Sequence, residues 1–119
     1  MTKLEPLLGT VVNELGAASN AALVILGDKL GLFRALSERA ATPSQLAEKT
    51  GTHERLVREW LSAQAASGFV TYDKEKHTFS MTAEQAAVFA IEDSPVFMAG
   101  GFSLMSAVYR DEPKLAEAF

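Results

Sequence analysis

Few side chains in this sequence have the type and spacing that catalysis or metal binding requires. The 119-residue chain contains two histidines, His53 and His77, and no cysteine. Neither histidine has a second ligand at the spacing of a metal motif, so we expect no metal site. His53 directly follows Thr52, which predicts a role in beginning a helix. Residues 101–103 (Gly-Phe-Ser) do not match the G-x-S-x-G nucleophile motif, and we predict no catalytic residue.

Several other polar or aromatic residues are better explained by a structural role than by catalysis or ligand binding. The adjacent carboxylates Glu92 and Asp93 precede Pro95, where one of them is expected to cap a helix. Gln64 lies among apolar residues, where an unpaired amide is costly, so we expect it to bond to nearby backbone. A polar contact across an interface is the alternative for Gln64. We expect Trp60 to be a core residue. Stacking on a ligand is the less favoured alternative.

The segment that begins at Thr42 predicts a helix-turn-helix. Thr42 can cap a helix, Pro43 suits its first position, and Gln45 can complete a capping box. That short helix should end before Gly51. A second helix is expected over residues 53–67, with one packing face and one free face.

Two alternating segments follow and predict a β-hairpin. They are residues 69–72 and 78–81, joined by a polar loop over residues 73–77. Helix, turn, helix and two-stranded wing in this order predict a mainly α, winged helix-turn-helix fold.

Capping signals and apolar residues at helical spacing predict further helices on both sides of this motif. They cover residues 4–18, 21–30 and 32–36 before it, and residues 82–90, 95–109 and 111–119 after it. Ser19 or Asn20 should cap the second of them. The apolar stretches within these segments are shorter than the roughly 20 residues that span a bilayer, so we expect no membrane contact and a cytoplasmic protein.

The charge distribution disfavours nucleic acid as a partner. The formal net charge is −4, and the whole excess lies in residues 82–119. In the predicted recognition helix, Arg55 and Arg58 are balanced by Glu54 and Glu59. DNA affinity comes largely from a basic surface, and this face is close to neutral. Some neutral winged helices bind DNA as dimers, so this alternative stays open.

The flanking helices carry more apolar surface than a small winged helix can cover. Residues 21–26 and 95–109 are apolar nearly all the way round. Such a surplus predicts contact with a partner chain or another domain, and we expect self-association through residues 21–32 and 95–109. In the alternative reading these helices wrap the domain as additional core.

Several segments, taken together with their spacing, resemble one family of enzymes. They are residues 26–36 (LGDKLGLFRAL), 42–47 (TPSQLA), 53–61 (HERLVREWL) and 68–70 (GFV). This combination resembles the N-terminal domain of bacterial class I S-adenosylmethionine-dependent methyltransferases of the small-molecule, O-methyltransferase-like kind. The resemblance runs from about residue 15 to residue 95 and arguably to the last residue.

The resemblance implies a division of the chain and a role for each part. Residues 1–36 would be N-terminal dimerisation helices, and residues 37–81 the winged helix-turn-helix. Residues 82–119 would be C-terminal helices leading to a Rossmann-like domain that is absent here. The chain has no G-x-G motif, the glycine-rich turn on which such a cofactor would lie. The resemblance therefore implies that S-adenosylmethionine binds in the Rossmann-like domain. The chain would then be a non-catalytic fragment that binds no cofactor by itself.

The resemblance also implies candidate site residues. The dimer interface would use a group of apolar residues from the N-terminal helices: Leu23, Val24, Leu26, Leu30 and Phe33. The pliable acceptor side of a substrate pocket would use an aromatic and methionine stripe: Phe97, Met98, Phe102, Met105 and Tyr109. Such a stripe is more often core than pocket.

Two functions therefore remain. The first is the dimerisation and substrate-lid domain of a small-molecule methyltransferase that forms a homodimer. The alternative is a dimeric winged-helix transcriptional regulator that binds DNA.

Overall fold

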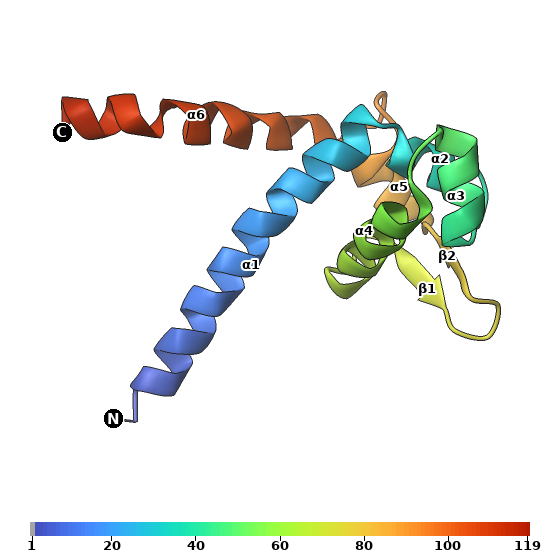
Figure 1. The fold of residues 1–119 in the computed structure, drawn as a ribbon, viewed down its shortest axis with the longest axis horizontal. Coiled ribbons are helices and arrows are strands. Elements are labelled where there is room, and N and C mark those ends of the chain that lie inside the picture. Colours follow the sequence, from blue (N-terminus) through green and yellow to red (C-terminus); the bar gives the residue numbers. More distant parts are fainter. Residues whose placement is uncertain (1) are drawn as a thin grey trace.

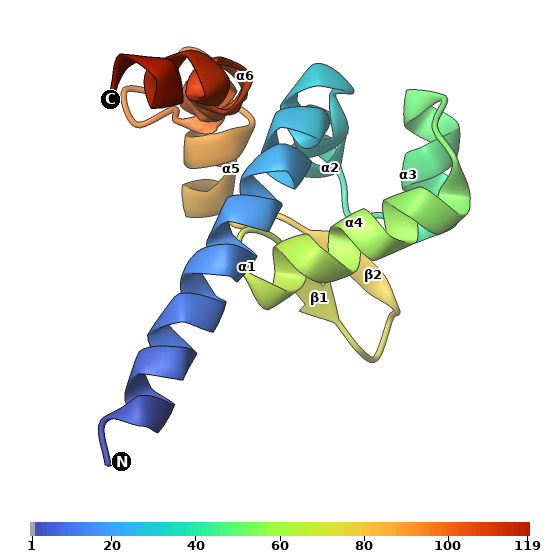
Figure 2. The same cartoon turned by 60° about the vertical axis from the view of Figure 1, so that its left-hand side comes forward.

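The computed structural model describes residues 2–119, which form a helical domain with two long protruding helices (Figure 1). Its elements in chain order are α1 (Leu4–Lys29), α2 (Leu32–Glu38), α3 (Pro43–Thr50), α4 (Glu54–Ala66), β1 (Thr71–Asp73), β2 (Thr78–Ser80), α5 (Ala83–Phe89), the 3-10 helix η1 (Ala99–Phe102) and α6 (Ser103–Ala118). Helices α2 to α5 and the hairpin form the compact part. Much of α1 and α6 extends away from it in different directions (Figures 1 and 2).

The predicted winged helix-turn-helix is confirmed, and local sequence explains its boundaries. The Thr42 side-chain oxygen accepts a hydrogen bond from the Gln45 backbone N–H, and the Thr42 backbone N–H donates to the Gln45 side-chain oxygen, so the predicted capping box begins α3. Gly51 ends this helix with a left-handed φ of 67°. Strands β1 and β2 pair antiparallel with Tyr72 opposite Phe79.

Residues 4–30 were predicted to form two helices, and that prediction is wrong. α1 is one helix of 26 residues that passes through Gly16, Ser19 and Asn20 without a break. A glycine costs a helix only about 1 kcal/mol, which does not end it when the flanking residues favour the helix. Asn20 does not cap a helix. Its side-chain oxygen accepts a hydrogen bond from Gln64 Nε2 on α4 at 2.8 Å.

The C-terminal helices also differ from their prediction. Residues 91–98 form turns rather than the start of a helix, and the backbone N–H of Met98 donates to the Val88 carbonyl at 2.8 Å. Gly100 and Gly101 lie in η1, where two glycines weaken a regular helix. α6 then continues past Tyr109 with Pro113 inside it, so no new helix begins near residue 111.

The core lies between α1, α2, α4, α5 and the wing. Phe33 is at its centre, with ring centroids 4.8 Å from Trp60 and 5.1 Å from Phe89. The Trp60 indole N–H donates to the Leu23 carbonyl at 2.8 Å, and Trp60 is buried, which confirms its expected core role. Gln64 is fully buried, and its amide bonds to Asn20 rather than to the backbone as expected.

Gly27 is the point of closest approach between α1 and the aromatic core. A Cβ atom at this position would lie 2.6 Å from Phe33 Cε2 and closer still to Trp60. We therefore expect Gly27→Ala to lower the free energy of unfolding by about 2 kcal/mol through overpacking, measured by urea denaturation. Gly16→Ala is the matched control, because a Cβ there meets nothing within 4 Å. It should stabilise the helix by up to about 1 kcal/mol, and equal effects at both positions would contradict the close approach.

Candidate functional site

An exposed apolar surface follows one face of α1. Its residues are spaced three or four apart, except for a step of eleven residues in the middle, and the last of them is the residue that caps the helix. They define what we call the α1 stripe: Leu4, Leu8, Val11, Leu15, Leu26 and Leu30. All six are exposed, Leu15 by 64% and Leu26 by 46%. Eleven residues make about three helical turns, so Leu15 and Leu26 lie on the same face. α1 runs unbroken from its protruding half to the half that covers the core (Figure 1). The stripe therefore continues along both halves.

The core-facing side of α1 is a different set of residues. Val24 is fully buried, and Gly27 meets Phe33 and Trp60. At 100° per residue, Val24 points away from Leu26 and Leu15 by about 160–180°. The stripe is thus the face that α1 turns away from its own domain.

A groove lies beside the C-terminal end of the stripe. It is a cavity of about 490 Å³ between α1 and α4, which we call the α1–α4 groove. Leu26 and Leu30 form one side of it, and Leu56 and Trp60 of α4 belong to the other. Leu56 is exposed, so three exposed leucines are among the residues that line the groove.

The predicted dimer-interface residues do not share one surface. Val24 and Phe33 are 0% and 1% exposed, so they pack inside their own chain, and their assignment to an interface is corrected. Their side chains fill the space between α1, α2 and α4. Leu26 and Leu30 are exposed, and Leu23 is half-buried at the edge of the groove. For these three residues a role in pairing stays a prediction.

The predicted substrate-pocket residues lie along η1, α6 and the turn before them. Phe97 and Phe102 are half-buried against the core, and Met105 is half-buried on α6. Met98 and Tyr109 are mostly exposed. The α1–α4 groove and the cavity between α4 and the wing are lined by other residues, so the pocket role of these five stays a prediction.

The exposed face of α4, the helix that would read DNA bases, carries paired charges. Arg58 Nη2 lies 2.9 Å from Glu54 Oε1, and Arg55 Nη1 lies 3.2 Å from Glu59 Oε1. Both pairs are exposed and contribute little to stability. They nevertheless place a carboxylate beside each arginine, which opposes the approach of a phosphate.

The length and composition of α1 test the expectation that no apolar segment is long enough to span a membrane. Its most apolar 18-residue window has a mean hydropathy of 1.3, and 17% of that window is buried. By length and composition this helix could cross a membrane, so the expectation that every apolar segment is too short is wrong for α1. An exposed apolar helix also suits packing against another protein chain.

A comparison with families of known proteins identifies the compact part. The model of the Rv2258c-like winged HTH domain matches residues 18–90, which is more than half of the chain. The chain belongs to this family. The match begins within α1 and continues through α5, so residues 18–29 of α1 belong to the winged HTH domain.

Solved structures with the same fold include O-methyltransferases. PigF with SAH aligns with a TM-score of 0.77 at 20% identity over 92% of this chain and 32% of its own. An O-methyltransferase family protein from Burkholderia thailandensis gives 0.73 at 20% identity over 92% and 32%. The mitomycin 7-O-methyltransferase MmcR gives 0.66 at 28% identity over 83% and 31%.

The winged HTH domain thus matches N-terminal domains of O-methyltransferases. The 119-residue chain spans about a third of the length of these proteins. None of the curated proteins matches it.

The stripe was only partly visible in the sequence. The spacing of Leu4, Leu8, Val11 and Leu15 indicates an apolar helical face, but the predicted break near Ser19 hid its continuation to Leu26. The groove depends on how α1 crosses α4, and a sequence pattern does not contain that crossing.

Proposed function

We propose that this chain is the dimerisation and substrate-lid domain of an S-adenosylmethionine-dependent small-molecule O-methyltransferase, acting as a homodimer in the cytoplasm. The α1 stripe is the observation that carries the proposal. An apolar surface along a whole helix is unfavourable in water, and a second copy can cover it. The similarity to O-methyltransferases supports the choice of enzyme class.

The stripe and the groove together favour an antiparallel pairing of two α1 helices. With a two-fold axis, residue i of the first chain contacts residue j of the second, and residue j of the first chain contacts residue i of the second. If the axis lies near the middle of the stripe, Leu4 and Leu8 of one copy lie against Leu30 and Leu26 of the other. The N-terminal leucines of each copy would then enter the partner's α1–α4 groove. A parallel pairing would leave both grooves open to water.

In this proposal the substrate lies against the C-terminal side of the domain. Phe102 of η1 and Met105 of α6 present half-buried apolar surface, as does Phe97 in the turn before η1. Met98 and Tyr109 extend this surface. Aromatic and methionine side chains adapt to flat, apolar acceptors. These residues would contact the acceptor and exclude water from it.

The residues that the structure describes do not fit S-adenosylmethionine itself. Dinucleotide-like cofactors lie on a glycine-rich turn after a parallel strand, whereas the sheet described here is an antiparallel hairpin. The loop after β1 begins Lys74-Glu75-Lys76 and contains no glycine. The cofactor would belong to another part of the parent enzyme, and we derive no step of methyl transfer from this chain.

Binding to DNA is the alternative, and an anisotropy titration with a random-sequence duplex at low salt separates the two. We expect no binding up to about 100 μM protein, because the arginines of α4 are paired with carboxylates. A variant with Glu54→Gln and Glu59→Gln removes those carboxylates and controls for the sensitivity of the assay, since it should bind detectably. Micromolar binding by the unmodified chain, with a steep dependence on salt, would contradict the proposed function.

A further inference from the structure

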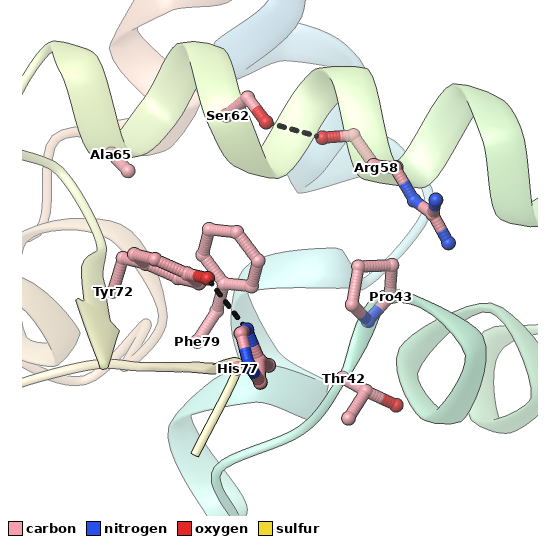
Figure 3. A pocket seen from close by; sticks show the side chains of 8 residues that line it. All are labelled: Thr42, Pro43, Arg58, Ser62, Ala65, Tyr72, His77 and Phe79. Carbon is pink, nitrogen blue, oxygen red and sulfur yellow. Dashed lines mark hydrogen bonds between the residues drawn. The ribbon is translucent and has the colours of Figure 1, made fainter. Parts of the chain in front are cut away.

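A second cavity lies between helix α4 and the wing, away from α1 and α6. Its volume is about 640 Å³, within the range of small-molecule sites. We call it the wing pocket. It is lined by Thr42, Pro43, Arg58, Ser62, Ala65, Tyr72, His77 and Phe79 (Figure 3).

The inner wall of the wing pocket is aromatic. The ring centroids of Tyr72 and Phe79 lie 4.8 Å apart with an angle of 42° between the rings. Phe79 is buried, so its ring is held by the core, and the Tyr72 ring is partly exposed beside it. Pro43 and Ala65 supply further apolar contact from α3 and α4 (Figure 3). A flat apolar molecule fits such a wall better than a flexible polar one.

The rim of the pocket offers hydrogen-bond donors. The Thr42 oxygen accepts from the Gln45 amide at 3.2 Å, which leaves its O–H to donate. Arg58 uses Nη2 on Glu54, and the other N–H groups of its guanidinium can serve a ligand. The His77 ring meets the Tyr72 hydroxyl through Nδ1 at 3.2 Å, which leaves Nε2. The residues that line the pocket include no carboxylate, so the rim favours a ligand that accepts hydrogen bonds.

The backbone at His77 is a third, independent feature. Its φ is +55°, a left-handed conformation that residues other than glycine adopt infrequently. Residues held in such conformations concentrate at binding and catalytic sites. His77 adopts this conformation in the loop of the wing, and its imidazole lines the pocket.

We propose that the wing pocket binds a planar aromatic carboxylate of about two fused rings. The rings would lie against Tyr72 and Phe79, and the carboxylate would meet the donors of Arg58 and His77. This inference goes beyond the proposed function, because the pocket is separate from both the α1 stripe and the α6 surface. A nucleic acid fits less well, since its many phosphates would meet Glu54 and Glu59 beside the two arginines.

The probe for this proposal is 2-naphthoate, followed by ¹H–¹⁵N NMR on the 119-residue chain. We expect saturable shifts centred on the amides of Ala65, Tyr72, His77 and Phe79, with a dissociation constant of about 1 mM or lower. The neutral analogue 2-naphthalenemethanol should bind about tenfold more weakly, because it cannot form charge-assisted hydrogen bonds.

Two variants and one matched control test the assigned contacts. Arg58→Gln should weaken 2-naphthoate by about tenfold and remove the preference over the neutral analogue. His77→Asn keeps a residue suited to the left-handed turn and should also weaken binding. Arg55→Gln is the control, since Arg55 has an equivalent ion pair but does not line the pocket.

Three results would overturn the proposal. They are the absence of saturable shifts, shifts centred on Leu26 and Leu56 of the α1–α4 groove, or equal losses with Arg58→Gln and Arg55→Gln. Because Arg58 is 61% exposed, its replacement should leave the fold intact, and the spectrum of the free variant checks this directly.

Discussion

Replacing Leu15 with glutamate is expected to convert the chain from a dimer to a monomer. Leu15 is 64% exposed in the single chain and lies near the middle of the α1 stripe. In the proposed pairing, a glutamate there would be buried against the partner without a counter-charge, at a cost of about 3 kcal/mol. That cost raises the dimer dissociation constant by more than about 100-fold. Sedimentation equilibrium over a range of concentrations measures it.

Asn13→Glu is the matched control for this experiment. Asn13 is also exposed in the protruding half of α1, but it lies on the face opposite Leu15. Its replacement adds the same charge two residues away and should leave association almost unchanged. If both variants lost association equally, net charge rather than the stripe would control pairing.

Replacing Phe33 with alanine is expected to have the largest effect on folding. Phe33 is 1% exposed, packs against Trp60 and Phe89, and lies beside Gly27. Removing a buried aromatic ring from such a site lowers the free energy of unfolding by about 4 kcal/mol. For a domain of this size, that is a large fraction of the total stability. Urea denaturation at low protein concentration measures this loss.

Leu30→Ala separates the core from the proposed interface. Leu30 was predicted as an interface residue together with Phe33, but it is about half exposed, at the edge of the α1–α4 groove. We expect its replacement to weaken association clearly while changing monomer stability by less than about 1 kcal/mol. A large loss of stability from Leu30→Ala, or none from Phe33→Ala, would contradict the assignment of the two residues.

Local signals predicted the central motif well because its boundaries depend on short-range hydrogen bonds. The capping boxes at Thr42 and Thr82 both form between residues three positions apart. The turn at Gly51 depends on a backbone conformation that glycine adopts without strain. Such features can be recognised without knowledge of the rest of the fold.

Features that depend on tertiary contacts were harder to predict. Asn20 suggested a helix cap, yet it lies within a helix and bonds to Gln64, which is 44 residues away in sequence. Val24 and Leu26 are both apolar, and the sequence does not distinguish them. Val24 is buried and Leu26 is exposed because of the way α1 packs across α4. Where two helices cross, their packing determines which apolar residues are buried and which are exposed. Helical periodicity alone does not separate the two groups.

Cross-linking between two single-cysteine variants is the most direct test of the proposed pairing through α1. The chain has no cysteine of its own, so each variant reports one position. We predict that a mixture of Leu8→Cys and Leu26→Cys chains forms mainly the mixed disulfide between positions 8 and 26, and faster than an Asn13→Cys control. Cross-linking only between identical positions, or no faster than in the control, would contradict an antiparallel dimer along the α1 stripe.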